Sequence, residues 1–303
     1  MTDLKAGVVG AGVFAGFHAR KYVSLREVTL AGVYDPDTAR ARALAADLGV
    51  RAFDTLQDLL DACQMVTVAS PASTHAEVAE QAVAAGRHVY VEKPLARTLE
   101  AGAALVEHAA LRRLVLACGH QERVAFAAMG LLDTPEPPRR LESVRRGLPG
   151  PRSRDVSCVL DLMIHDLDLA LQLAGDDILS VTASGEFDEV RAEIVFRGGL
   201  RAVLQASRIA SARERTMHLQ YSSGAVAVDF LTPSFANSAP FALDPLFAVS
   251  PEGRDPLGAS VGGFLSAVQG RTRRPVVTGE EGLAALALAL SVERAAGLQA
   301  GLV

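Results

Sequence analysis

The segment from Leu160 to Leu173 has the apolar character of a buried helix but carries a few titratable side chains. At about 100° per residue, Asp161, His165, Asp168 and Gln172 fall in one narrow stripe, and nearly everything else in the segment is apolar. Such a helix is costly to bury unless these groups face a cavity or each other. We therefore predict that His165 and Asp161 form an oriented acid/base pair. The alternative is a histidine that a carboxylate satisfies at a domain interface.

A lysine follows another apolar run. Lys93 lies in Glu92-Lys93-Pro94, directly after the strand-like residues His88 to Val91. In an open parallel sheet, ligands gather at the carboxyl ends of the strands. There Lys93 could donate to a substrate oxygen or, with its pKa lowered by burial, accept a proton. A surface lysine in a proline turn is an equally weighted alternative. Ser70 to His75 follows the preceding strand-like run in the same way.

Glycines near the start of the chain suggest a phosphate-binding turn. Gly10 allows a tight turn from strand to helix, Gly12 lets the backbone approach a pyrophosphate, and the small Ala15 allows close helix packing. Asp35 ends the next strand-like run, where a carboxylate would accept hydrogen bonds from a ribose and repel a 2′-phosphate. We predict NAD binding and consider NADP less suitable. The alternative is an ordinary strand-to-helix turn with a solvated aspartate.

The elements that must position these residues differ between the two parts of the chain. Residues 1–120 alternate apolar strand-like runs with helical segments, which indicates a parallel sheet covered on both faces. After several prolines and the helix described above, residues 179–230 have the pattern of successive strands with short turns. We predict an α/β protein with a doubly wound dinucleotide-binding domain over 1–120. An α+β substrate-binding and oligomerisation domain on an open, mainly antiparallel sheet would cover 121–303.

Composition excludes several classes of protein. The net charge of −5 over 303 residues gives no general electrostatic reason to bind nucleic acid. The three cysteines lack paired spacing, and the polar helix has one histidine, so neither a disulfide framework nor a metal site is expected. No signal-peptide pattern precedes the first strand, and the longest apolar run, from Leu283 to Val292, is too short to span a bilayer. We expect a soluble cytoplasmic protein.

In combination, these motifs resemble the Gfo/Idh/MocA family of NAD(P)-dependent oxidoreductases. The resemblance rests on Gly10-x-Gly12-x-x-Ala15-x-x-His18, Ser70-Pro71 to His75, Glu92-Lys93-Pro94 and Asp161-x-x-x-His165, which occur in the family's order and approximate spacing. Each motif is short, but their joint occurrence is specific and covers nearly the whole chain.

The resemblance implies roles for individual residues. Lys93 is the expected catalytic lysine, with Asp161 and His165 as its partners in the substrate domain, and either Lys93 or His165 accepts the hydroxyl proton. Gln121 stands where the family often has an asparagine near the nicotinamide. The residues expected to bind the cofactor are Gly10, Ala11, Gly12, Val13, Phe14, Asp35, Ser70, Pro71, His75, Glu92, Lys93 and Gln121.

The stretch from Asp161 to Asp166 is also similar to the subgroup related to UDP-N-acetylglucosamine 3-dehydrogenases, which implies hydride transfer from C3 of a nucleotide sugar. Nearby arginines could bind a diphosphate, although a solvated basic loop is at least as good an interpretation: Arg139, Arg140, Arg145, Arg146, Arg152 and Arg154. The segment Gln121 to Phe126 departs from the continuation expected for the subgroup.

Two alternatives to a nucleotide-sugar dehydrogenase stay open. One is a dehydrogenase of a free polyol such as an inositol, and the other is a regulatory protein that binds a dinucleotide without turnover. Retention of Lys93, Asp161 and His165 favours an enzyme, because a sensor has no chemical need for them. An open sheet would leave one face to water, so we also expect a homo-oligomer, either a dimer or a tetramer.

Overall fold

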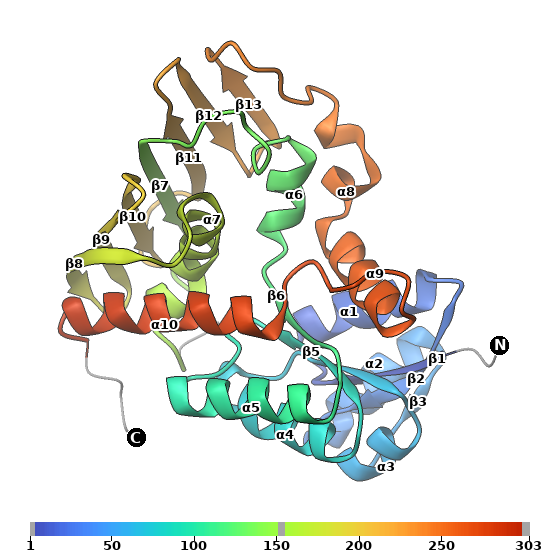
Figure 1. Cartoon of the computed structure of the whole chain (residues 1–303). Coiled ribbons are helices and arrows are strands. Elements are labelled where there is room, and N and C mark those ends of the chain that lie inside the picture. Colours follow the sequence, from blue (N-terminus) through green and yellow to red (C-terminus); the bar gives the residue numbers. More distant parts are fainter. Residues whose placement is uncertain (1–3, 151–154, 299–303) are drawn as a thin grey trace. The chain divides into compact units, whose positions relative to one another are not determined.

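The computed structural model describes residues 4–150 and 155–298 (Figure 1). Its contacts divide the chain into two compact units. The first unit comprises residues up to Gln121 together with Leu257–Leu283, and the second comprises Glu122–Pro256 together with residues from Ala284 onward. The first change of unit falls after Gln121, one residue beyond the boundary expected from the sequence, and Leu257–Leu283 returns to the first unit.

A six-stranded parallel sheet, with strand order β3-β2-β1-β4-β5-β6, forms the centre of the first unit. The predicted doubly wound sheet is confirmed. Its strands are β1 Leu4–Val9, β2 Val28–Tyr34, β3 Arg51–Ala52, β4 Met65–Val68, β5 His88–Glu92 and β6 Leu116–Gly119. The helices are α1 Val13–Ser24, α2 Thr38–Leu48, α3 Leu56–Asp61, α4 His75–Ala84, α5 Leu99–Leu111 and α9 Pro256–Val268.

Helices cover both faces of this sheet. Successive strand residues point to opposite sides, so both faces carry apolar side chains that the helices bury. Val9 belongs to an apolar cluster with residues of α3, α4 and α5. Val8 belongs to a second cluster with α1 and with Phe264 of α9 (Figure 1). Tyr90 of β5 also hydrogen-bonds Ser260 of α9 at 3.0 Å. The late segment returns to the first unit because α9 completes one of its two helical layers.

The second unit contains a seven-stranded sheet with order β13-β12-β11-β7-β10-β9-β8, in which only the β7–β10 pair is parallel. The predicted mainly antiparallel sheet is confirmed. The strands are β7 Arg140–Arg146, β8 Ile178–Glu186, β9 Glu189–Phe196, β10 Arg201–Ser207, β11 Glu214–Gln220, β12 Ala225–Asp229 and β13 Ser234–Asn237. The helices are α6 Glu122–Ala128, α7 Ile164–Ala174, α8 Pro251–Arg254 and most of α10 Gly279–Ala295.

Buried ion pairs connect the helices of the second unit to its sheet. Arg123 of α6 makes two hydrogen bonds to Asp168 of α7, at 2.7 and 2.6 Å. Arg145 of β7 binds Asp166 of α7 at 3.1 and 2.9 Å and Glu122 of α6 at 2.9 Å. Bidentate geometry of this kind offsets much of the desolvation of the charges. These pairs fix α6 and α7 against the inner face of the sheet.

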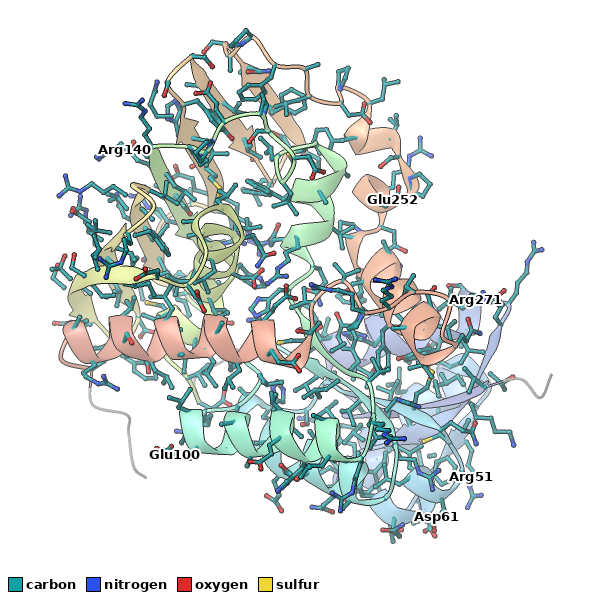
Figure 2. All side chains as sticks on the ribbon, viewed as in Figure 1. Arg51, Asp61, Glu100, Arg140, Glu252 and Arg271 are labelled. Atoms are coloured by element: carbon teal, nitrogen blue, oxygen red, sulfur yellow. The ribbon has the colours of Figure 1, made fainter. Side chains whose placement is uncertain are left out.

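In contrast to these buried ion pairs, the charged side chains on the surface are open to solvent. Charged side chains from both units are exposed, among them Arg51, Asp61, Glu100, Arg140, Glu252 and Arg271 (Figure 2). Among the described residues, no helix combines the length and the apolar character that crossing a membrane requires.

Replacing Arg123 with methionine should destabilise the protein strongly. The change leaves Asp168 buried without its main counter-ion, which lowers the free energy of unfolding by about 3–5 kcal/mol. Arg197→Met is the matched control, because Arg197 forms an exposed pair with Asp177 and the loss should stay below about 1 kcal/mol. Denaturant unfolding measures both values. Equal effects of the two substitutions would contradict a structural role for the buried pair.

Candidate functional site

The turn between β1 and α1 is held against both neighbouring strands. Gly10 has φ +106°, and its amide donates to Tyr34 O at 2.8 Å. A Cβ atom at Gly10 would lie 2.7 Å from the carbonyl oxygen of Ala69, so a side chain is excluded there. The predicted need for glycine at this position is therefore a consequence of backbone packing.

Gly12 leaves the beginning of α1 open. It precedes the helix in an extended conformation and provides no side-chain cap, and a Cβ atom at Gly12 would meet nothing within 4 Å. The first amides of a helix lack partners within the helix and favour an anion. Val13 and Phe14 beside this turn are exposed. This end of α1 fits the diphosphate of a dinucleotide.

Asp35 lies beside the same turn. One carboxylate oxygen accepts the amide of Ala11 at 2.7 Å, and the other accepts the amide of Asp37 at 2.8 Å. Each oxygen can accept a further hydrogen bond. Asp35 therefore holds the turn in place and keeps the acceptor capacity for the hydroxyls of a ribose.

His75 connects the two loops that follow β4 and β5. Its ring nitrogens lie 2.9 Å from Ser70 O and 2.7 Å from Pro94 O. Burial lowers the pKa of His75, and a neutral imidazole carries one N–H, so it donates to one of these carbonyls at a time. The Ser70 hydroxyl in turn accepts a hydrogen bond from Thr74 at 2.7 Å. The ring thus links the Ser70–Pro71 loop to the loop that carries Lys93.

Glu92 is buried beneath Lys93. One carboxylate oxygen contacts His18 Nε2 at 2.7 Å and accepts from Gln121 Nε2 at 2.6 Å, and the other accepts the Lys93 amide at 3.2 Å. Burial raises the pKa of Glu92, but the hydrogen bond from His18 and the charges of His18 and Lys93 outweigh it and lower the pKa. The Gln121 amide also lies 3.3 Å from the hydroxyl of Tyr90. Glu92 therefore holds the backbone of the Lys93 loop and is itself held by Gln121.

The polar helix of the second unit begins differently from the uniform helix that the sequence predicts. Residues Val159–Met163 form a π-helical turn before α7, so Asp161 does not follow the 100° spacing of the later residues. Asp161 and His165 are both half-buried. Asp168, three residues after His165 in α7, is buried and paired with Arg123.

Arg208 is a neighbour of Asp161 that the sequence analysis missed. Its guanidinium lies 3.6 Å from the Asp161 carboxylate and 2.6 Å from that of Asp188, above the ring of Phe187. Arg208 follows directly after β10, but nothing in its local sequence distinguishes it from other arginines. The contact places a fixed positive charge beside the predicted catalytic carboxylate.

Among the residues that the structure describes, the arginines considered for a diphosphate do not form one cluster. Arg140 and Arg146 are exposed and pair with Glu142 and Glu214, whereas Arg145 is buried on the opposite face of β7. Side chains alternate between the two faces of a strand, and this alternation separates them. Arg139 precedes the strand, and Arg152 and Arg154 lie outside the described residues.

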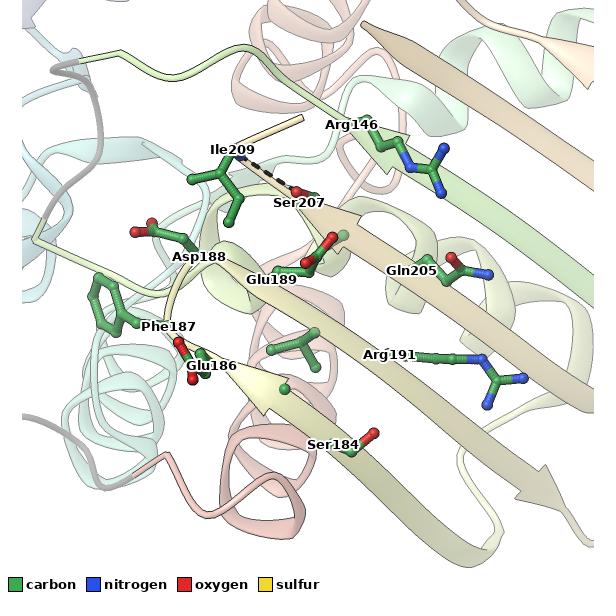
Figure 3. A pocket seen from close by; sticks show the side chains of 13 residues that line it. Arg146, Ser184, Glu186, Phe187, Asp188, Glu189, Arg191, Gln205, Ser207 and Ile209 are labelled. Atoms are coloured by element: carbon green, nitrogen blue, oxygen red, sulfur yellow. Dashed lines mark hydrogen bonds between the residues drawn. The ribbon is translucent and has the colours of Figure 1, made fainter. Parts of the chain in front are cut away.

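A hollow of about 490 Å³ lies at the β8–β9 hairpin of the second unit, and Figure 3 shows Arg146, Arg191 and Gln205 extending on one side of the sheet there. None of the residues predicted to be catalytic or to bind the cofactor lines it, and of the arginines considered for a diphosphate only Arg146 does. Of the predicted catalytic residues, Lys93 lies in the first unit, and Asp161 and His165 lie in the second.

Comparisons with known proteins agree with a dinucleotide-binding fold in the first unit. The family described as "Oxidoreductase family, NAD-binding Rossmann fold", Gfo/Idh/MocA, matches residues 4–120. UDP-N-acetylglucosamine 3-dehydrogenase from Acidithiobacillus ferrooxidans is 37% identical over 96% of this chain and 97% of the relative. A solved structure of that enzyme has a TM-score of 0.88 over 99% of this chain and 100% of its own. Inositol 2-dehydrogenase from Rhizobium meliloti is 26% identical, with 94% of each chain covered.

Alanine at Gly12 should separate ligand binding from folding. The new methyl group enters open space beside the turn, so stability should be preserved, whereas affinity for NADH should fall by about tenfold or more through loss of a charge-assisted contact. Gly10→Ala, the control, should destabilise the fold by at least about 1 kcal/mol through backbone strain. NADH fluorescence titration and thermal unfolding measure these effects. Unchanged NADH affinity in Gly12→Ala would place the diphosphate elsewhere.

Acid should remove the stabilisation that ionised Glu92 provides. Because its pKa in the folded protein lies below the usual value of 4.5, the contribution is present above that value and disappears as the pH falls through the lowered one. Glu92→Gln should therefore be less stable at neutral pH and lose less stability on acidification. Denaturant unfolding between neutral pH and about pH 2 tests this prediction. Parallel pH profiles of the wild type and the variant would refute it.

Proposed function

This chain belongs to the Gfo/Idh/MocA family of oxidoreductases with an NAD-binding Rossmann fold, and on that premise we propose that it oxidises a hydroxyl group of a nucleotide sugar. UDP-N-acetylglucosamine is the first candidate substrate and C3 the carbon oxidised. The observation that carries the proposal is the similarity to a dehydrogenase of that substrate along nearly the whole of both chains.

The first unit supplies the residues proposed to hold the dinucleotide. When bound, NAD accepts a hydride at C4 of its nicotinamide. The amides at the start of α1, after Gly12, bind the diphosphate, and the Asp35 carboxylate accepts hydrogen bonds from the adenosine ribose. The same negative charge disfavours a 2′-phosphate, which supports NAD over NADP.

Lys93 and His165 are proposed to handle the proton of the substrate hydroxyl. Lys93 lies beside the ionised Glu92, and this attraction supports a role as the cation that donates to the reacting oxygen. His165 then accepts the hydroxyl proton on a ring nitrogen as the hydride leaves the carbon. Asp161, beside Arg208, is proposed to orient the substrate or the histidine. Glu92 positions the Lys93 loop, and Gln121 holds Glu92 in place.

We also propose that the protein is a cytoplasmic homo-oligomer. The outer face of the sheet in the second unit carries two hollows, of about 490 and 550 Å³, and exposed side chains on several neighbouring strands. A second copy of the chain could cover this face.

The test is formation of NADH with UDP-N-acetylglucosamine and with free inositols. The wild type should reduce NAD with the nucleotide sugar. Lys93→Met and His165→Asn should each lower kcat by about 10²-fold or more, because each removes a proton-handling group, while NADH affinity is retained. Arg197→Met is again the control. Turnover of an inositol alone would identify a polyol dehydrogenase, and NAD binding without any turnover would identify a sensor.

A further inference from the structure

Two arginines lie opposite each other on the inner face of the sheet in the second unit. The antiparallel register of β7 and β11 pairs Arg145 with Arg215. The next pairs along the same face, Met217 with Ser143 and Leu219 with Leu141, are buried, so both arginines point to the helix-covered side. Like charges directly opposite each other destabilise a sheet. A second charge at this place therefore requires an explanation.

The carboxylates nearby are already used by Arg145. It is almost completely buried, and its guanidinium makes hydrogen bonds to both Asp166 oxygens and to Glu122. It also lies 5.8 Å from the centre of the Phe230 ring. Its role is structural, because it fixes α6 and α7 to β7. Arg215, which lies opposite Arg145 on the neighbouring strand, interacts with these carboxylates electrostatically and at longer range.

Arg215 differs from Arg145 in both exposure and partners. Arg215 and the neighbouring Arg213 are exposed, and within residues 4–150 and 155–298 their side chains form no hydrogen bond or ion pair. Partial burial and then the charge of Arg145 lower the pKa of Arg215, with Arg213 adding to the effect and Glu122 and Asp166 opposing it. An arginine nevertheless stays protonated under physiological conditions. Arg215 and Arg213 thus form a cationic site that has no hydrogen-bonded counter-ion among the described residues.

We propose that Arg215, assisted by Arg213, binds the phosphate groups of a phosphorylated sugar substrate. A guanidinium offers a planar fork of donors that matches phosphate oxygens. Asp166, which holds Arg145, is the direct chain neighbour of His165, so the cation lies on the side of the sheet that carries the proposed base. The inference rests on the proposed function and specifies its substrate class, because neither a free sugar nor an inositol has an anionic group to pair with Arg215.

The proposal has a consequence for stability that a structural role would not have. Removing Arg215 relieves the repulsion across the strands, so Arg215→Met should keep or raise the thermal unfolding temperature. Removing Arg145 leaves two carboxylates without their partner and should lower it strongly. A clear loss of stability in Arg215→Met would mean that Arg215 belongs to the structural network and would overturn the proposal.

Steady-state kinetics test the substrate class. With UDP-N-acetylglucosamine, Arg215→Met should raise KM by about tenfold or more with little change in kcat, and Arg215→Lys should recover part of the loss. With N-acetylglucosamine 1-phosphate, Arg215→Met should raise KM by the same factor if Arg215 binds a single phosphate. The factor should be smaller if Arg215 binds both phosphates of the diphosphate. Any turnover of free N-acetylglucosamine should be unaffected. Equal effects on phosphorylated and free sugars, or no effect on either, would refute the site. Arg197→Met controls for the loss of charge.

A binding measurement keeps the test independent of the reaction. Titration calorimetry with UDP, and separately with inorganic pyrophosphate, is performed on the NADH-loaded protein. Affinity for both should fall by about tenfold or more in Arg215→Met and remain unchanged in Arg197→Met. If no sugar is turned over but this difference appears, the proposed reaction fails and the anion site stands. If the nucleotide sugar is turned over and the variants bind UDP alike, the anion site fails and the reaction stands.

Discussion

The burial of ionised carboxylates is the constraint on which much of this structure depends. A carboxylate removed from water must be paired or hydrogen-bonded, and each partner it acquires is thereby fixed in position. Glu92 fixes the Lys93 loop to α1 through His18 and to the end of β6 through Gln121. In the second unit, Asp166 and Asp168 fix α7 to β7 and α6. The same pairs that stabilise each unit hold the backbone beside its proposed catalytic residues.

This constraint also distinguishes structural charges from functional ones. Arg123 and Arg145 are buried with bidentate partners, and such pairs orient helices without facing a ligand. Arg215 lies on the same inner face but is exposed and lacks such a partner among the described residues. Folding gains nothing from a second positive charge opposite Arg145. Residues that weaken a fold locally are most readily explained by a function, and the phosphate of a substrate explains this one.

At the turn between β1 and α1, steric contacts of the backbone fix the local structure. Gly10 is required because the carbonyl of Ala69 occupies the place of a side chain, whereas Gly12 borders open space. Gly10 is therefore required by the fold, whereas Gly12 is proposed to allow the approach of a diphosphate. Asp35, the residue proposed to bind the ribose, holds this turn through the Ala11 amide. The turn is thus shaped before any ligand binds.

The sequence by itself determined the parallel sheet, the antiparallel sheet and the family, because these depend on local patterns. Apolar periodicity specifies strands and helices, and the glycine turn, the Glu92-Lys93-Pro94 loop and the spacing of Asp161 and His165 are contiguous or nearly so. Only the tertiary structure decided which charges meet. Asp168 turned inward to Arg123, Arg208 came beside Asp161, and α9 returned to the first sheet across more than a hundred residues. The physical reason is that the pairing of a charge and the packing of an amphipathic helix depend on neighbours distant in sequence, and the alternation of one strand separated arginines that are adjacent in the chain.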